Sequence, residues 1–120
     1  MRYLLLFYAD ESEWLALREA ERVAAIGRIG AWYGRLARGG TIVEGKRLAG
    51  GKRATTTVRL GRVKRSGDAP VVSDGPFVEA KEAVGSYAIV EVADRAEAVA
   101  IAKSWPVGRV IEVRPVDDGG

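Results

Sequence analysis

The feature that most constrains the fold is the helical pattern of residues 11–38, which directly follows a short apolar segment at residues 2–8. The apolar segment is too short for a buried helix, so we predict a central strand that is buried on both faces. Apolar side chains at i, i+3 and i+4 spacing in the helical stretch are expected to form one stripe facing the core. This stripe consists of Val23, Ile26, Ile29, Tyr33 and Leu36. A strand followed by a long helix indicates a fold that mixes α and β structure.

The start and the interior of this helix carry further signals. Asp10, with Glu13 three residues later, resembles a capping box and predicts the helix start. Trp14 and Leu17 form an earlier apolar stripe, which leaves open a separate first turn. Glycine inside a helix costs about 1 kcal/mol relative to alanine, so three of them indicate close packing against a sheet or a partner. They are Gly27, Gly30 and Gly34.

Strand patterns and one more helix fill the rest of the chain. Strands are expected at residues 41–45, 54–60, 85–93 and 109–116, and a helix at residues 95–104. Asp94 with Glu97 predicts the start of that helix. Alternation along the last two strands assigns their faces. One face carries Tyr87, Ile89, Glu91, Val110, Glu112 and Arg114, and the other carries Ala88, Val90, Val92, Ile111 and Val113.

The order of these elements predicts the fold class. It is an α+β chain of the order β-α-β-β-α-β with a β-hairpin or loop insertion, which is the ferredoxin-like plan. We expect a single domain over residues 1–120, with residues 2–8 between the last two strands and both helices on one face of the sheet. The other face would then expose an apolar patch, so we predict a homodimer whose sheets pack face to face.

Two residue types are missing from the chain, and their absence excludes several chemistries. There is no cysteine, so disulfides and thiolate sites are excluded. There is no histidine, so a Ser-His-Asp triad or a His-ligated zinc site is excluded as well. Gly27 and Gly30 lie inside the helix and no Walker A motif occurs, so no nucleotide-binding loop is predicted. The sequence also predicts no metal and no cofactor. The first residues contain neither a signal peptide nor a membrane span, so we expect a cytoplasmic protein without a membrane partner.

The positive charge of the chain is concentrated in one segment. Residues 46–65 contain eight basic residues and no acidic one, whereas the remainder has 11 basic and 16 acidic residues, a net charge of −5. One interpretation is a patch for a polyanion or an acidic partner. The other, which we favour, is a solvated hairpin whose cations discourage strand aggregation. Nucleic acid is not an expected partner, because aromatic residues do not interleave with the basic ones.

A turn sequence at Asp74-Gly75-Pro76-Phe77 is the sharpest local motif. Asp74 can accept backbone hydrogen bonds, Gly75 permits a positive φ, and Pro76 makes the turn rigid, with a cis Gly75–Pro76 bond left open. The motif predicts a rigid loop that fixes how Phe77 docks. The alternative places Asp74 at the mouth of a pocket, where apolar Phe77 would raise the pKa of the carboxyl group and allow general-base catalysis.

Four further residues are candidates for a site. Glu112 and Arg114 point the same way on one strand, so they are expected to form a buried ion pair within or between subunits, or an anion-binding arginine oriented by a carboxylate. Tyr8 and Tyr87 can serve as donors in the same cavity, although aromatic residues on strands are more often part of a core. The predicted ligand-binding residues are therefore Tyr8, Asp74, Gly75, Pro76, Phe77, Tyr87, Glu112 and Arg114, with Asp74 as the catalytic candidate.

The stretch VVSDGPFVEAKEAVGSYAIVEV resembles the signature of the DGPF proteins within the YciI-like (YCII-related) family. The opening YLLLFYADESEW and the last strand are similar to that family too. The resemblance implies a dimeric α+β-barrel fold. Some relatives are thought to use a His–Asp pair, which does not carry over because this chain has no histidine. DGPF proteins often accompany extracytoplasmic-function sigma factors, which implies a regulatory or sensing context.

Three functions follow as expectations. The first is a homodimer that binds a small polar or anionic ligand in a cleft between the open sheet face and the DGPF loop. The second is a non-catalytic regulatory or interaction protein, linked to sigma-factor-dependent transcription, that uses residues 46–65. The third is an enzyme that transfers protons through Asp74, and the sequence leaves open whether the protein is an enzyme at all.

Overall fold

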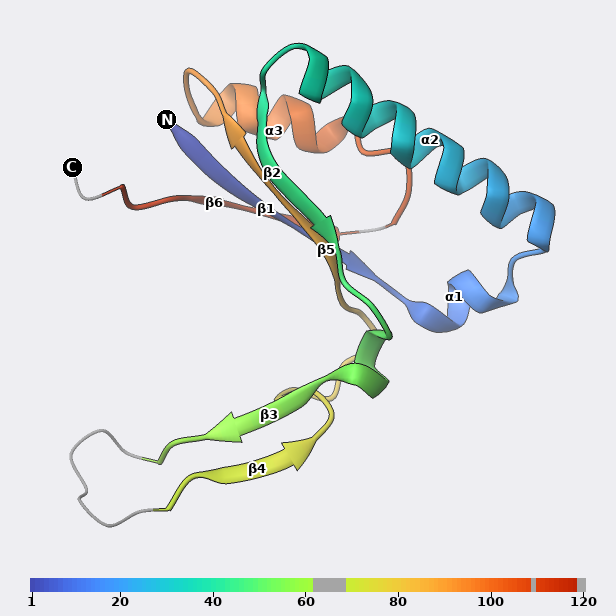
Figure 1. Cartoon of the computed structure of the whole chain (residues 1–120), viewed down its shortest axis with the longest axis vertical. Coiled ribbons are helices and arrows are strands. Elements are labelled where there is room, and N and C mark those ends of the chain that lie inside the picture. Colours follow the sequence, from blue (N-terminus) through green and yellow to red (C-terminus); the bar gives the residue numbers. More distant parts are fainter. Residues whose placement is uncertain (62–68, 109, 119–120) are drawn as a thin grey trace.

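The computed structural model describes residues 1–61, 69–108 and 110–118, and Figure 1 shows their arrangement. The elements in chain order are β1 (Arg2–Ala9), α1 (Glu11–Ala16), α2 (Glu19–Arg38), β2 (Ile42–Arg47), the 3₁₀ turn η1 (Gly51–Ala54), β3 (Thr56–Arg59), β4 (Val71–Asp74), β5 (Ala83–Glu91), α3 (Arg95–Lys103) and β6 (Val110–Pro115). The expected strand at 54–60 is shorter because its first residue belongs to η1. The return of the chain expected at residues 63–65 lies outside the described residues.

One antiparallel sheet of four strands organises the fold. Its strand order is β2-β5-β1-β6, so β1 lies between β5 and β6 as the sequence predicts. Helices α2 and α3 both lie on one side of this sheet (Figure 1). The chain therefore has a mixed α+β fold with one helix-covered sheet face.

The central strand β1 alternates, contrary to the expectation that it is buried on both faces. Tyr3, Leu5 and Phe7 are buried beneath the helices, whereas Leu4 and Leu6 on the opposite face are only half-buried. Six successive apolar residues hid this alternation in the sequence, because both sets of side chains are apolar. Among the residues that the structure describes, no second layer covers this other face of β1.

The first helical stretch is divided into two helices, because Leu17 and Arg18 adopt extended backbone angles between α1 and α2. Asp10 does begin the first helix, and its Oδ1 accepts hydrogen bonds from the backbone N–H of Ser12 at 2.9 Å and from the Ser12 hydroxyl at 2.6 Å. The second helix has a cap of its own, since Glu21 Oε1 accepts a hydrogen bond from the backbone N–H of Arg18 at 3.0 Å. The separate first turn that the sequence left open is therefore a short helix.

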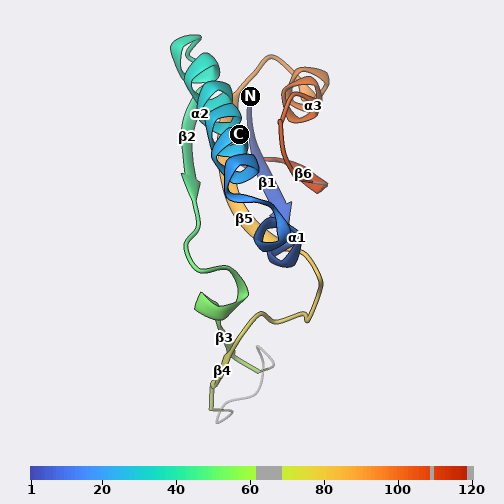
Figure 2. The same cartoon turned by 90° about the vertical axis from the view of Figure 1, so that its right-hand side faces the viewer.

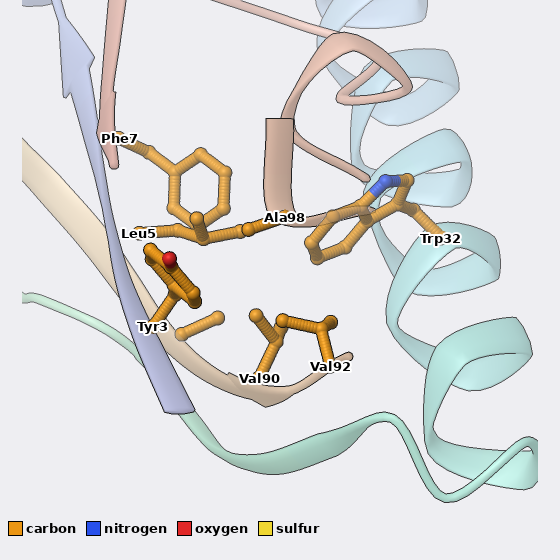
Figure 3. Close-up of a cluster of buried hydrophobic side chains, with 8 residues drawn as sticks. Tyr3, Leu5, Phe7, Trp32, Val90, Val92 and Ala98 are labelled. Atoms are coloured by element: carbon orange, nitrogen blue, oxygen red, sulfur yellow. The ribbon is translucent and has the colours of Figure 1, made fainter. Parts of the chain in front are cut away.

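The predicted stripe of α2 is correct for its second half, because Tyr33 and Leu36 pack against the buried core and Ile29 is half-buried, and it is wrong for its first half. Val23 is 63% exposed and Ile26 is also exposed, whereas Ala25 and Trp32 are buried. Figure 3 shows Trp32 pointing into the buried cluster from α2. Its indole N–H donates to the Ser104 hydroxyl at 2.8 Å. This bond gives the buried indole nitrogen the hydrogen-bond partner that it would otherwise lack. The helix thus buries Trp32 beside the second half of the predicted stripe and leaves Val23 and Ile26 exposed.

The interior glycines of α2 do not mark close packing within the chain. A side chain added at Gly27 or Gly30 would meet nothing within 4 Å, and one at Gly34 would meet only the Arg38 guanidinium. The predicted packing role of these glycines is therefore wrong for the single chain. The second capping prediction is correct: Asp94 Oδ1 accepts from the backbone N–H of Glu97 at 2.9 Å and begins α3.

The strands β3 and β4 form a separate two-stranded sheet. We call this hairpin, with its described flanks at residues 55–61 and 69–78, the arm. Figures 1 and 2 show the arm extending beyond one end of the main sheet. It makes the molecule long and flat, with extents of 50 × 44 × 18 Å. Within the described part of the chain, no helix is long and apolar enough to cross a membrane.

Candidate functional site

The sheet face opposite α2 and α3, which we call the open face, gathers the first group of candidate residues. Strand register places its side chains in two neighbouring rows across the sheet. One row runs Glu44, Ile89, Leu4, Arg114, and the next runs Lys46, Tyr87, Leu6, Glu112. Each row thus has an apolar middle and opposite charges at its two ends. Tyr8 lies beside the second row, opposite Val110.

Tyr87, a predicted site residue, is fixed on this face by a carboxylate. Its hydroxyl donates a hydrogen bond of 2.7 Å to Glu44 Oε1 on the neighbouring strand β2. This bond stabilises the neutral phenol and raises the pKa of Tyr87 above its usual value. Glu44 was not predicted from the sequence, because only the observed register of β2 against β5 brings it opposite this region.

Tyr8 forms a second tyrosine–carboxylate pair on the other side of the same face. Its hydroxyl hydrogen-bonds to the carboxylate of Glu112 on β6, which raises the pKa of the Tyr8 phenol. Two tyrosines on adjacent central strands are thus each oriented by a glutamate on an edge strand. Both phenols stay protonated at neutral pH, and each gives its single O–H to its glutamate, so towards a ligand the phenol oxygen can only accept a hydrogen bond.

Arg114 shares the face with these pairs, but its predicted ion pair is not formed. Glu112 and Arg114 are both exposed in the single chain, and they do not lie within ion-pair distance of one another. The carboxylate of Glu112 is engaged by Tyr8 instead. Among the described residues, Arg114 therefore has no acidic partner, and its guanidinium is free to meet an anion.

The DGPF loop lies apart from the open face, at the end of β4 where the arm returns to the body. Gly75 has the expected positive φ of +93°, and its bond to Pro76 is trans. The loop is tied to β3, because the backbone N–H of Gly75 donates to Thr55 O at 2.7 Å and the Thr57 hydroxyl donates to Gly75 O at 2.6 Å. The loop is thus held in place by the strand beside it.

The expected docking of Phe77 and the expected cleft are absent from the single chain as described. Phe77 is 67% exposed, with the guanidinium of Arg59 over its ring at 5.0 Å. Asp74 is exposed as well and lines neither of the two hollows beside α3. Within one protomer, Asp74 is therefore not the buried carboxyl group that general-base catalysis would need.

The basic segment at residues 46–65 is not one hairpin surface. Its described members belong to three elements: Lys46 and Arg47 lie in β2, Lys52 and Arg53 in η1, and Arg59 in β3. Lys46 is on the open face, while Lys52 donates from Nζ to the carbonyl oxygen of Ala80. The positive charge is therefore spread from the open face to the arm.

Sequence reasoning missed a charged junction at the base of the arm. Asp10 is buried, and its Oδ2 has no hydrogen-bond partner among the described residues. The hydrogen bonds from Ser12 hold the pKa of Asp10 below its usual value, and the charge of Lys81 contributes to the same shift. The carboxylate of Glu11, the next residue, lies so close to Gly51 that a Cβ atom added at Gly51 would come within 2.7 Å of it. Only the folded chain brings these three segments together.

A groove of about 780 Å³ lies on the helix side of the sheet, between α3 and β6. Its floor is apolar and Arg95 and Lys103 lie along it; the predicted site residues do not line it. Its lining residues are Tyr3, Arg95, Val99, Ala102, Lys103, Trp105, Val107, Gly108, Ile111, Val113 and Pro115. The sequence predicts that Ile111 and Val113 of this lining face the core. Helix α3 is short and leaves this part of the sheet uncovered.

The geometry defines a small α+β protein with helices on one sheet face and tyrosine–glutamate pairs on the other. The model of the YCII-related domain matches residues 1–118, so the chain belongs to the YCII-related family. A comparison with curated proteins found no match.

Proposed function

We propose that this protein is a ferredoxin-like homodimer, a dimeric α+β barrel, that binds a small polar or anionic ligand between the open face and the DGPF loop. The observation that carries the proposal is the open face itself. Its middle consists of half-buried apolar side chains from β1 and β5, among them Leu4, Leu6 and Ile89. A sheet face of this kind is stable in water when a second layer covers it.

The surface of the chain supports dimerisation. It exposes 8632 Å², whereas a compact monomer of 12.9 kDa exposes about 6,300 Å². The excess of roughly 2,300 Å² is in the range that each chain of an obligate dimer buries. A second copy of the same chain would cover this excess surface.

The charges of the open face are complementary to themselves. A two-fold axis parallel to the strands would place Glu44 opposite Arg114 of the second copy, and Lys46 opposite Glu112. A two-fold axis across the strands would place each acidic residue opposite the basic residue on its own strand. Both symmetric arrangements therefore pair opposite charges between sheets that stack about 10 Å apart.

The ligand class follows from the groups that the face offers. One cationic group of the face is Arg114, whose five guanidinium N–H donors can bind a ligand as well as the carboxylate of the second copy that faces it in either arrangement. The O–H groups of Tyr8 and Tyr87 are engaged by their glutamates, so these tyrosines offer acceptor oxygens. A guanidinium recognises carboxylates and phosphates through charge-assisted hydrogen bonds. We therefore expect a small molecule with a carboxylate or phosphate group.

Calorimetric titration with malonate and with inorganic phosphate tests the ligand class. We expect at least one of them to bind the wild-type dimer, and Arg114→Gln to weaken that binding at least about tenfold, as loss of a charged hydrogen bond does. Arg95→Gln, which removes an equal charge from the groove on the helix side, is the matched control and should bind normally. Equal binding by the wild type and Arg114→Gln would contradict the proposal, as would binding of neither anion.

The regulatory alternative remains a proposal of a different class. It is supported by the basic residues that β2, η1 and β3 carry towards the arm. Proton transfer through Asp74 would require the dimer to bury that carboxylate. Retention on heparin at graded salt would favour the regulatory function, because a polyanion surface loses affinity as salt rises.

A further inference from the structure

We infer that the arm of each protomer packs against the second copy and brings its Asp74 to the open face of the other chain. The inference rests on the homodimer proposed above and goes beyond it, because it assigns the DGPF loop to a site shared between two chains. Its starting point is that one protomer holds the two halves of the candidate site apart: Tyr8, Tyr87, Glu112 and Arg114 on the sheet, and Asp74 on the arm.

The arm lies outside the compact body of its own chain. Its strands pair with one another and belong to a sheet of their own. The radius of gyration is 17.0 Å, whereas a compact domain of 120 residues has about 14 Å. A two-stranded hairpin is at best marginally stable alone in water, so this one needs a surface to pack on.

The arm exposes large apolar side chains of the kind that are usually buried. Leu60 is 71% exposed and Val72 is 65% exposed, although both are large and apolar. Val58 and Val72 face each other across the hairpin on one side. The pair of Thr56 and Asp74 lies two positions along the strands from these valines. Because side chains alternate between the two faces, Asp74 lies on the same face as the valines. Any surface that buries the two valines therefore also receives the carboxylate of Asp74.

The position of the arm selects the second copy as its occupant. Figure 1 shows the arm extending on the side of the sheet away from α2 and α3, which is the side of the open face. A protomer seated on the open face therefore lies next to the arm. Lys52, before the arm, donates to the carbonyl oxygen of Ala80, after it, so the two segments that lead into and out of the arm are held together.

Photocrosslinking of the full-length protein tests the inference. The chain has no cysteine, so one introduced cysteine carries one crosslinker. Val72→Cys and Asp74→Cys are each labelled with benzophenone maleimide and mixed with isotopically heavy wild-type chains. We expect crosslinks between light and heavy chains from both variants. The attachment points of Asp74→Cys should lie on β1, β5 or β6 of the other chain.

Val23→Cys on α2 is the matched control, because this valine is equally exposed but lies on a helix that covers the opposite side of the sheet. We expect Val23→Cys to form no crosslinks between chains. A sedimenting dimer in which the arm crosslinks only to its own body, or only to the other arm, would overturn the inference and leave the homodimer standing. A sedimenting mass of one chain would instead overturn the proposed homodimer, and the shared site with it.

Discussion

Gly45 lies in β2 where α2 packs on the sheet, and its missing side chain sets how closely Tyr33 approaches. A Cβ atom at Gly45 would come within 2.7 Å of Tyr33 Cε1 and 3.3 Å of the Tyr87 carbonyl oxygen. The ring of Tyr33 has little freedom to retreat, because it packs edge-on against Trp32 at 5.0 Å. This position therefore requires glycine for steric reasons.

We expect Gly45→Ala to lower the free energy of unfolding by about 1–3 kcal/mol, as overpacking does. Gly30→Ala is the control. A side chain at Gly30 meets nothing within 4 Å, so alanine should stabilise helix α2 by up to about 1 kcal/mol. Urea unfolding of the two variants measures both effects, and equal stabilities would contradict the packing seen at Gly45.

The tyrosine–glutamate pairs predict how the open face responds to alkaline pH. The folded pKa of Tyr87 is raised by its bond to Glu44, so this bond contributes stability below the unfolded pKa of tyrosine, near 10. The contribution is lost as pH rises through the folded pKa.

Glu44→Gln should therefore shift the titration of Tyr87 back towards the ordinary value. Ultraviolet difference absorbance of the phenolate follows it, with Tyr87→Phe identifying the transition that belongs to this residue. Glu91→Gln, which removes a carboxylate bound to Arg2 on the same face, should leave the titration unchanged. An unaltered curve in Glu44→Gln would rule out the bond as the cause.

Single residues also show what sequence alone can predict about the site. Parity along β5 and β6 correctly placed Tyr87, Glu112 and Arg114 on one face, because alternation is a local property of a strand. Glu44 was missed because its position depends on the register of a distant strand and a bulge beside it. Asp10 was read only as a helix cap, because its burial depends on segments that meet in the folded chain.

At the scale of elements, the main error of prediction was the first half of the apolar stripe on α2, since Tyr33 and Leu36 of its second half do pack on the core. The sequence carries two candidate apolar stripes on this helix, one with Val23 and Ile26 and one with Ala25 and Trp32. Spacing cannot separate them, since both repeat with the period of a helix. The sheet decides, because Phe7 and Trp105 form an aromatic wall that receives the indole of Trp32, with ring centroids 5.7 Å and 4.9 Å away.

We expect Trp32→Ala to lower the free energy of unfolding by about 3–5 kcal/mol, the usual cost of removing a buried tryptophan. Val23→Ala should change it by no more than about 0.5 kcal/mol, because Val23 is on the exposed side of the helix. Thermal or urea unfolding measures both. A larger effect at Val23 than at Trp32 would restore the stripe predicted from spacing.

The arm could not be foreseen either, for a different reason. The strand pattern of residues 54–60 was visible, but β-branched residues occur in strands of any sheet. Whether such a hairpin joins the main sheet or leaves it depends on the turn η1 and on the link after Asp74. Those segments carry no periodic pattern from which their direction could be read.

For the whole molecule, charge reversal on the open face tests the symmetry of the proposed dimer. Arg114→Glu should raise the dissociation constant of the dimer at least about tenfold, because it places like charges together. A second reversal, Glu44→Arg, should restore association if the two-fold axis runs parallel to the strands. If the axis runs across the strands, Glu112→Arg should restore it instead.

Sedimentation equilibrium measures these dissociation constants, and Arg28→Glu on the outer side of α2 is a control for the change in net charge. A dimer of unchanged affinity in Arg114→Glu would show that the open face is not the interface.

The alternating charges of the two rows also bear on how two chains meet. Glu44, Lys46, Glu112 and Arg114 sum to zero, so the face has little field beyond the screening distance of about 8 Å in physiological salt. Such a surface does not steer a partner from afar, and encounter should proceed at the ordinary unsteered rate of about 10⁵–10⁶ per molar per second. Added salt should therefore leave the encounter rate nearly unchanged and shorten the lifetime of the complex.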